Sequence, residues 1–193
     1  MIKIKYSCSL GPCCHSSRLL KTNNLKLESY PFDWIFSNID SVFECIDKNF
    51  ENFFTSDFNF FHHSPLSTVH DIDNTDNTDN QYFCRCISRF KKMISCDGVK
   101  LFVYSCINQK IYENKINHAK EIKNKLDKYV DNYILLYIYN CCEQTIPSHK
   151  LTIHDNIHYL ELYTVSVSNG DHFRRKCDRN YINNLIKTMY SIC

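Results

Sequence analysis

Hydrophobic and polar positions alternate along several short stretches of the chain, and each of these stretches predicts a β-strand. Residues 2–10 place isoleucines and a tyrosine between lysines, and residues 99–106 and 157–165 are rich in β-branched and aromatic side chains. Residues 133–140, Tyr-Ile-Leu-Leu-Tyr-Ile-Tyr-Asn, are apolar on both faces. An apolar run of this kind is typical of a strand buried in a parallel sheet.

Other stretches repeat apolar residues at the three- and four-residue spacing of a helix. The predicted helices are Cys14 to Leu20, Pro31 to Phe53, Tyr82 to Ile94, Asn114 to Val130 and Tyr181 to Ile192. Strands that alternate with helices indicate one α/β domain over residues 1–193. We expect a Rossmann-like three-layer sandwich around a mostly parallel sheet of about four or five strands.

A polar repeat interrupts this pattern after the second predicted helix. Residues 73–80 read Asp-Asn-Thr-Asp-Asn-Thr-Asp-Asn, which predicts a polar loop insert at about 71–81. The chain has only 3 glycines, so each is expected where the backbone needs unusual freedom. Gly11 and Pro12 follow the first predicted strand and are expected to form a turn.

Composition and charge limit the classes of protein to which the chain can belong. The net charge of +2 supplies no strong positive field, so we expect no nucleic-acid partner. The apolar runs are too short to cross a membrane, and the first residues lack the apolar core of a signal peptide. The 12 cysteines include the adjacent pairs Cys13-Cys14 and Cys141-Cys142, a pattern that does not suit a disulfide framework. We therefore expect a cytoplasmic protein with reduced thiols and no membrane partner.

Cys14 is the first candidate for chemistry. It follows a predicted strand and the Gly11-Pro12 turn, at or near the start of a helix. Ligands in open α/β sheets bind beyond the carboxyl ends of the strands, and a helix N-terminus lowers the pKa of a thiol. The alternative is a cysteine that only packs in the core, as many cysteines do.

A thiolate nucleophile needs an imidazole to exchange protons with it. The chain offers His62, His63, His70, His154, His158 and His172, and sequence spacing does not select one of them. Adjacent ligand types such as Cys13, Cys14 and His15 form no zinc knuckle, so we expect no metal and no other cofactor.

A basic cluster precedes the last predicted helix. It comprises Arg174, Arg175, Lys176 and Arg179. A solvated turn is the simpler interpretation, and a bound anion is the other.

Three segments in order resemble the putative papain-like cysteine peptidase family, a set of proteins from bacteria and large DNA viruses. They are Ser9-Leu-Gly-Pro-Cys-Cys14, Ser29-Tyr-Pro-Phe-Asp-Trp34, and Val69-His70-Asp71 followed by Arg85-Cys-Ile-Ser-Arg89-Phe90. The resemblance covers roughly the first half of the chain. Cys86 stands where the family has a second arginine, and the polar insert follows Asp71.

The resemblance implies a cysteine peptidase or related thiol hydrolase or acyl transferase. Cys14 would be the nucleophile, His70 the base, and Asp33 the residue that orients the imidazole. Gly11, Trp34, Asp71, Arg85 and Arg89 would shape the site. A papain-like α+β fold is the alternative architecture that the family name implies.

The partner would be a protein or peptide substrate. If the protein is viral, the compartment would be the host cytoplasm. Two rivals use the same scaffold: a non-catalytic interaction protein that binds a host protein, and a binder of small or sugar-linked molecules.

Overall fold

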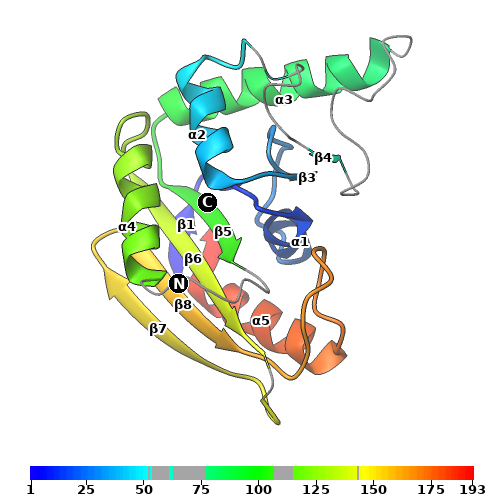
Figure 1. Cartoon of the computed structure of the whole chain (residues 1–193). Helices are drawn as coiled ribbons and strands as arrows, with labels where there is room; N and C mark the ends of the chain where they lie inside the picture. The colour runs from blue at the N-terminus through cyan, green and yellow to red at the C-terminus, as the bar shows by residue number, and fades with distance from the viewer. Residues whose placement is uncertain (52, 54–60, 63–76, 107–114, 143) are drawn as a thin grey trace.

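The centre of the protein is a five-stranded sheet, seen in a computed structural model that describes residues 1–51, 53, 61–62, 77–106, 115–142 and 144–193 (Figure 1). The strands follow the order β2-β5-β6-β8-β7. They are β2 (Tyr6–Ser9), β5 (Lys100–Cys106), β6 (Tyr133–Cys141), β8 (Ile157–Tyr163) and β7 (Ser148–His154). The first four run parallel, and β7 pairs antiparallel with β8. The expected mostly parallel α/β sheet is confirmed.

Helices cover both faces of this sheet, as the predicted three-layer arrangement requires. Helices α1 (Cys14–Thr22) and α5 (Lys176–Met189) pack on one face. Helices α2 (Ile39–Asp47), α3 (Asn77–Ser95) and α4 (Lys115–Leu126) pack on the other. None of the described helices is long and apolar enough to span a membrane.

Alternation along β5 explains how one strand serves two cores. Leu101 and Val103 belong to the core beneath α1 and α5, whereas Phe102 and Tyr104 belong to the core beneath α2, α3 and α4. Successive side chains of a strand point to opposite faces, so a strand covered on both sides must be apolar throughout.

The first predicted strand divides into two. Residues Ile2–Ile4 form β1, which pairs in parallel with β9 (Tyr190–Ile192) outside the main sheet. The division falls at Lys5, where the backbone N–H groups of Lys5 and Tyr6 both donate to the carbonyl of Val99. The predicted end of the last helix at Ile192 is therefore wrong, since its final residues form β9.

The second helix begins later than predicted. Residues Ile35–Phe36 form β3, which pairs antiparallel with β4 (Phe61–His62), and α2 starts only at Ile39. The Asn38 side chain caps α2 by accepting the Ser41 N–H at 2.7 Å. The prediction of a helix from Pro31 is wrong because this Asn cap, rather than the proline, sets the helix start.

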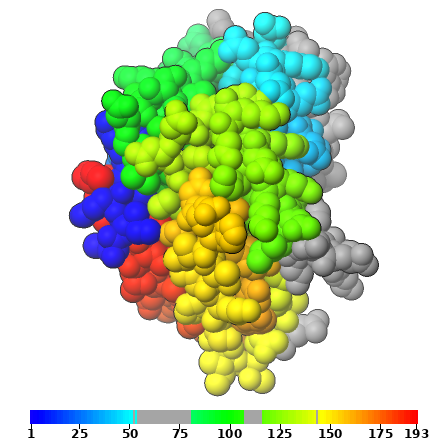
Figure 2. Space-filling view, turned by 90° about the vertical axis from the view of Figure 1, so that its left-hand side faces the viewer, coloured from blue at the N-terminus to red at the C-terminus, as the bar shows by residue number. Residues whose placement is uncertain are grey.

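Other boundaries also differ from expectation, and one strand was not expected. Helix α2 ends at Asp47 rather than Phe53, and α4 ends at Leu126 rather than Val130. Helix α3 starts at Asn77, inside the predicted polar loop, whose residues 71–76 lie outside the described part of the chain. Helix α5 starts at Lys176 rather than Tyr181. Strand β7 lies exposed at the edge of the sheet, beside the surface formed by α4 (Figure 2). Its polar residues gave no strand signal.

Candidate functional site at the start of helix α1

Cys14 is the first residue of α1, and a tight turn connects it to the carboxyl end of β2. Gly11 has a φ of +83°, and the Gly11–Pro12 peptide bond is cis. A Cβ added to Gly11 would lie 2.6 Å from Ser37 Oγ, so this backbone position requires glycine. Ser37 N–H donates to the Pro12 carbonyl at 3.1 Å and holds the outer side of the turn.

Buried serines fix the same turn from the sheet side. Ser16 Oγ donates to the Gly11 carbonyl and contacts Ser105 Oγ, both at 3.0 Å. Ser9 Oγ accepts the Gly11 N–H at 3.2 Å. These bonds tie the start of α1 to the ends of β2 and β5, so the predicted location of Cys14 at this edge of the sheet is confirmed.

The Cys14 thiol is protected from water and is not acidic. Cys14 is 6% exposed, and burial raises its pKa. The Asp171 carboxylate raises that pKa further, whereas the peptide N–H of Cys14 and the Arg18 guanidinium oppose the shift. Burial likewise raises the pKa of Cys13 to about 11. The expectation that the helix N-terminus would make Cys14 acidic is wrong, because burial and the Asp171 carboxylate raise its pKa more than the Cys14 N–H and the Arg18 guanidinium lower it.

Asp33 forms a buried ion pair beside α1. Its Oδ2 accepts from Lys26 Nζ at 2.5 Å and from the Tyr30 N–H at 2.7 Å, and Asp33 is 1% exposed. Lys26 Nζ also donates to Ser17 Oγ on α1 at 2.7 Å. The described partners of Asp33 are thus a cation and the peptide groups of Tyr30 and Ser9. The contact with a His70 imidazole remains a prediction, because His70 lies outside the described residues.

Trp34 lies against the same side of α1. Its ring centroid is 4.5 Å from Lys26 Nζ, 5.6 Å from the Arg18 guanidinium and 6.0 Å from Lys21 Nζ. A large aromatic face attracts cations through its quadrupole. The Pro-Phe-Asp-Trp block therefore docks on α1 through Lys26, by the ion pair at Asp33 and the cation–π contact at Trp34.

The remaining predicted site residues do not lie beside Cys14 in the described part of the chain: they are either outside the described residues or on α3. Asp71, like His70, lies outside the described residues. Arg85 and Arg89 are on α3, where Arg85 is exposed and Arg89 Nε lies 3.9 Å from Glu28 Oε1. No group of three or more metal-ligating side chains comes together within the described part of the chain.

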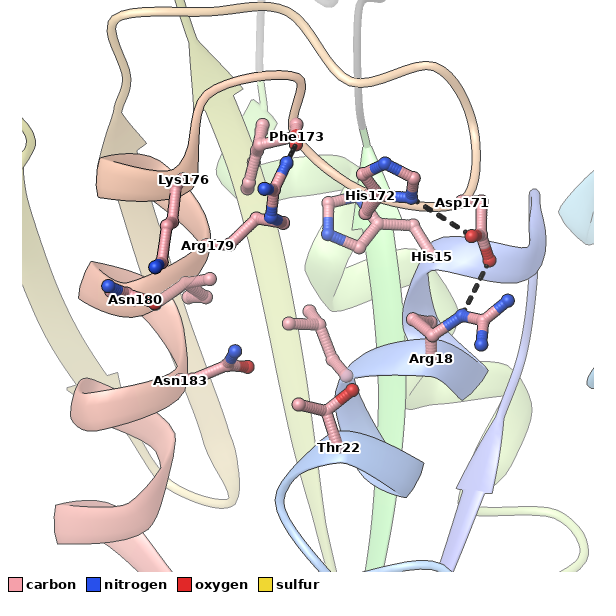
Figure 3. Close-up of a pocket in the computed structure, with 12 residues that line it drawn as sticks. His15, Arg18, Thr22, Asp171, His172, Phe173, Lys176, Arg179, Asn180 and Asn183 are labelled. Carbon is pink, nitrogen blue, oxygen red and sulfur yellow. Dashed lines mark hydrogen bonds and ion pairs between the residues drawn. The ribbon is translucent and has the colours of Figure 1, made fainter.

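A second polar cluster adjoins α1 on the side that faces α5, and sequence reasoning missed it (Figure 3). Asp171 accepts from Arg18 Nε at 2.8 Å through Oδ1, and its Oδ2 lies 3.0 Å from His172 Nδ1. Burial raises the pKa of Asp171, but the bonds from Arg18 and His172 outweigh it and leave that pKa lowered. The contact of Arg18 with Asp171 spans most of the chain, so no local pattern could have revealed it.

His15 forms the wall between this cluster and the core. It is 2% exposed, and its Nδ1 lies 3.1 Å from Ser168 Oγ. Burial lowers the pKa of His15 to about 3, so its imidazole is neutral at physiological pH. A ring with a pKa of about 3 is a weak base, and its Nδ1 is engaged with Ser168, so His15 is a structural element of the helix.

Comparison with known proteins gives one finding. The model of a family described as "putative papain-like cysteine peptidase (DUF1796)" matches residues 5–61. This segment includes Gly11, Cys14, Asp33 and Trp34, and it ends before His70. No curated protein matches the chain, and no solved structure does.

Proposed function

We propose that the protein is a thiol hydrolase of the cysteine peptidase class, with Cys14 as its nucleophile. The observation that carries the proposal is the position of Cys14, at the first residue of a helix beyond the carboxyl end of β2. In parallel α/β sheets this is the edge where ligands bind. The match of residues 5–61 to the family described as "putative papain-like cysteine peptidase" supports the same assignment.

The raised pKa of Cys14 determines the form of the mechanism. A thiol that is protonated in the free protein has to lose its proton to a base as it attacks. Cys14 Sγ then bonds to the substrate carbonyl carbon, and the carbonyl oxygen takes the negative charge. Peptide N–H groups in the first turn of α1 are suited to stabilise that oxyanion, because they have no acceptor within the helix.

The base that takes the proton returns it to the leaving amine, which departs as the C–N bond breaks. Water then attacks the resulting thioester, regenerates the thiol and releases the carboxylic acid. The substrate class we propose is a protein or peptide acyl group, in keeping with the family description.

Two histidines are candidates for the base. The family resemblance favours His70, which lies outside the described residues. The described residues offer His172 as the alternative, because the Asp171 carboxylate lies 3.0 Å from its Nδ1 and orients the ring, and the same carboxylate acts on the pKa of Cys14. Imidazoles in hydrolytic sites are commonly oriented in this way by a carboxylate.

Asp33 and Trp34 are proposed as positioning residues. Lys26 connects both of them to α1, so they fix the wall of the site next to Cys14 without contributing the base. Gly11 shapes the turn that presents Cys14.

The test compares the hydrolysis of fluorogenic peptides and activated esters by the wild type and four variants. Cys14→Ala should abolish turnover, whereas Cys13→Ala, its neighbour with an equally buried thiol, should retain it. Between His70→Ala and His172→Ala, the variant that lacks the base should lose about 100-fold or more in kcat. Turnover that survives in Cys14→Ala would eliminate the proposal.

The rival function is a binding protein without catalysis, and the 6% exposure of Cys14 favours it. This rival predicts that neither esters nor peptides are turned over and that Cys14→Ala leaves binding to a partner protein intact. Absence of turnover in the wild type across peptide and ester substrates would support the rival.

A further inference from the structure

A pocket of about 450 Å³ lies between α1 and α5, a size typical of small-molecule sites. Figure 3 shows His15, Arg18 and Thr22 on the α1 side and Lys176, Arg179 and Asn183 on the α5 side. The residues from α5 include part of the basic cluster that the sequence presents as a solvated turn. Asp33 and Trp34 do not line this pocket, although Arg18, which does, also lies over the Trp34 ring.

Positive charge exceeds negative charge in this pocket. Arg18, Lys176 and Arg179 contribute three cations, and Asp171 supplies the only carboxylate among the described residues that line it. Arg18 is already paired with Asp171 at 2.8 Å. Two cations, Lys176 and Arg179, therefore remain without a carboxylate partner in the pocket.

The two unmatched cations are held differently. Arg179 Nη1 donates to the carbonyls of Phe173 at 2.7 Å and Arg174 at 2.8 Å, which fixes its guanidinium at the pocket. Lys176 has no hydrogen-bond or ion-pair partner within the described part of the chain and is exposed. A fixed guanidinium fork beside a free ammonium is a common arrangement for binding phosphate.

The start of α5 adds to the positive electrostatic potential of the pocket. Lys176 is the first residue of this 14-residue helix, so the positive end of the helix dipole lies at the pocket. The acidic residue of the first turn, Asp178, is buried and directed elsewhere. Its carboxylate accepts from the N–H groups of Val165 and Ser166, both at 2.9 Å.

The rest of the lining is apolar or neutral. Leu19 and Ile182 contribute apolar side chains, and the ring of Phe173 meets the neutral ring of His15 edge to face at a centroid distance of 4.7 Å. Such a surface suits the flat or apolar part of a ligand, beside a charged end at Lys176 and Arg179.

We propose that this pocket binds a small phosphomonoester, with its dianionic phosphate at Lys176 and Arg179 and its organic group against Leu19 and Phe173. Two unmatched cations and a helix N-terminus fit two negative charges better than the single charge of a carboxylate. The proposal does not require catalysis by Cys14, which does not line the pocket, although His172 and Asp171 do.

Isothermal titration calorimetry with phenyl phosphate tests the proposal on the full chain. The expected result is saturable binding at one site, tighter than that of inorganic phosphate, which lacks the organic group, and tighter than that of benzoate, which lacks the second charge. Trp34, the only tryptophan, contacts Arg18 and offers a second readout through its fluorescence.

Two substitutions in α5 provide matched variants. Lys176→Gln removes an exposed cation of the pocket and should weaken phenyl phosphate binding about tenfold. Lys187→Gln removes an exposed cation from the last turn of the same helix, outside the pocket, and should leave binding unchanged. Failure of phenyl phosphate to saturate, or equal weakening by both variants, would overturn the proposal. Equal affinity for benzoate would overturn the assignment to phosphate.

Discussion

Two ion-pair clusters lie on either side of helix α1, and they differ in burial and in charge balance. The Lys26–Asp33 pair is enclosed, with side chains 7% and 1% exposed, and its charges match one to one. The Arg18–Asp171 pair is open, with side chains 45% and 32% exposed, and further cations surround it.

This difference indicates a structural role for the Lys26–Asp33 pair and a ligand-binding role for the Arg18–Asp171 cluster. An enclosed pair is not accessible to a ligand from solution, so its role is to hold the Pro-Phe-Asp-Trp segment on α1. An open pair surrounded by additional cations has a net positive charge that can attract an anionic ligand from solution. Cys14 lies at the end of the helix that the two clusters share.

The largest expected effect comes from breaking the enclosed pair. Lys26→Met leaves the Asp33 carboxylate buried without its cation, and should lower the free energy of unfolding by about 3–5 kcal/mol. Arg18→Gln is the matched substitution in the open pair and should cost less than about 1 kcal/mol. Urea denaturation of both variants measures the contrast. Equal losses would show that the two clusters do not differ as described.

The pH dependence of stability tests whether His15, on the side of α1 that faces α5, is buried in its neutral form. The unfolded chain protonates His15 below about pH 6.5, whereas the folded protein keeps it neutral down to about pH 3. Stability that is present above pH 6.5 is therefore lost as the pH falls toward 3, by about 1.4 kcal/mol per pH unit. Between pH 6 and 4 this amounts to about 3 kcal/mol.

Variants that replace the titrating imidazole of His15 isolate its contribution to the pH dependence of stability. His15→Asn and His15→Phe should each flatten the slope of stability against pH by one proton. A slope between pH 4 and 6 that is the same in the wild type and in both variants would contradict the buried, neutral state of His15.

A smaller effect is expected at the turn before Cys14. Gly11→Ala places a Cβ 2.6 Å from Ser37 Oγ at a positive φ, and should cost about 1–3 kcal/mol of unfolding free energy. Gly170→Ala has a similar φ but only ordinary contacts, the nearest at 3.5 Å to Phe36, so it should cost less. In a Ser37→Ala background the cost of Gly11→Ala should fall. An unchanged cost there would exclude the contact as its cause.

The sequence predicted most of the sheet because burial on both faces leaves a strong local signal. Strands β5 and β6 are mostly apolar and buried along nearly their whole length, and their predicted bounds differ from the observed ones by a single residue. Strand β7 lacks this signal because it lies at the sheet edge with a mostly exposed surface. The predicted start of α2 is wrong because the prediction makes Pro31 the first residue of the helix, whereas Asn38 caps it.

The site was predictable only in part. The position of Cys14 followed from local features, namely a strand, a turn and a helix start. Its raised pKa did not, because burial and Asp171 act on it through the tertiary structure. The pairing of Asp33 with Lys26 and the pocket at Arg18 likewise depend on contacts that sequence spacing does not encode.

The most direct test of the central claim asks which cysteine carries an acyl group. The wild type is mixed briefly with p-nitrophenyl acetate at pH 7.5, quenched in acid and mapped by fragmentation mass spectrometry, with Cys14→Ala and Cys13→Ala in parallel. Our account predicts a transient acetyl group on Cys14 in the wild type and in Cys13→Ala, which disappears as the thioester hydrolyses. Acetylation of the other cysteines with Cys14 unmodified would contradict the assignment of Cys14 as the nucleophile.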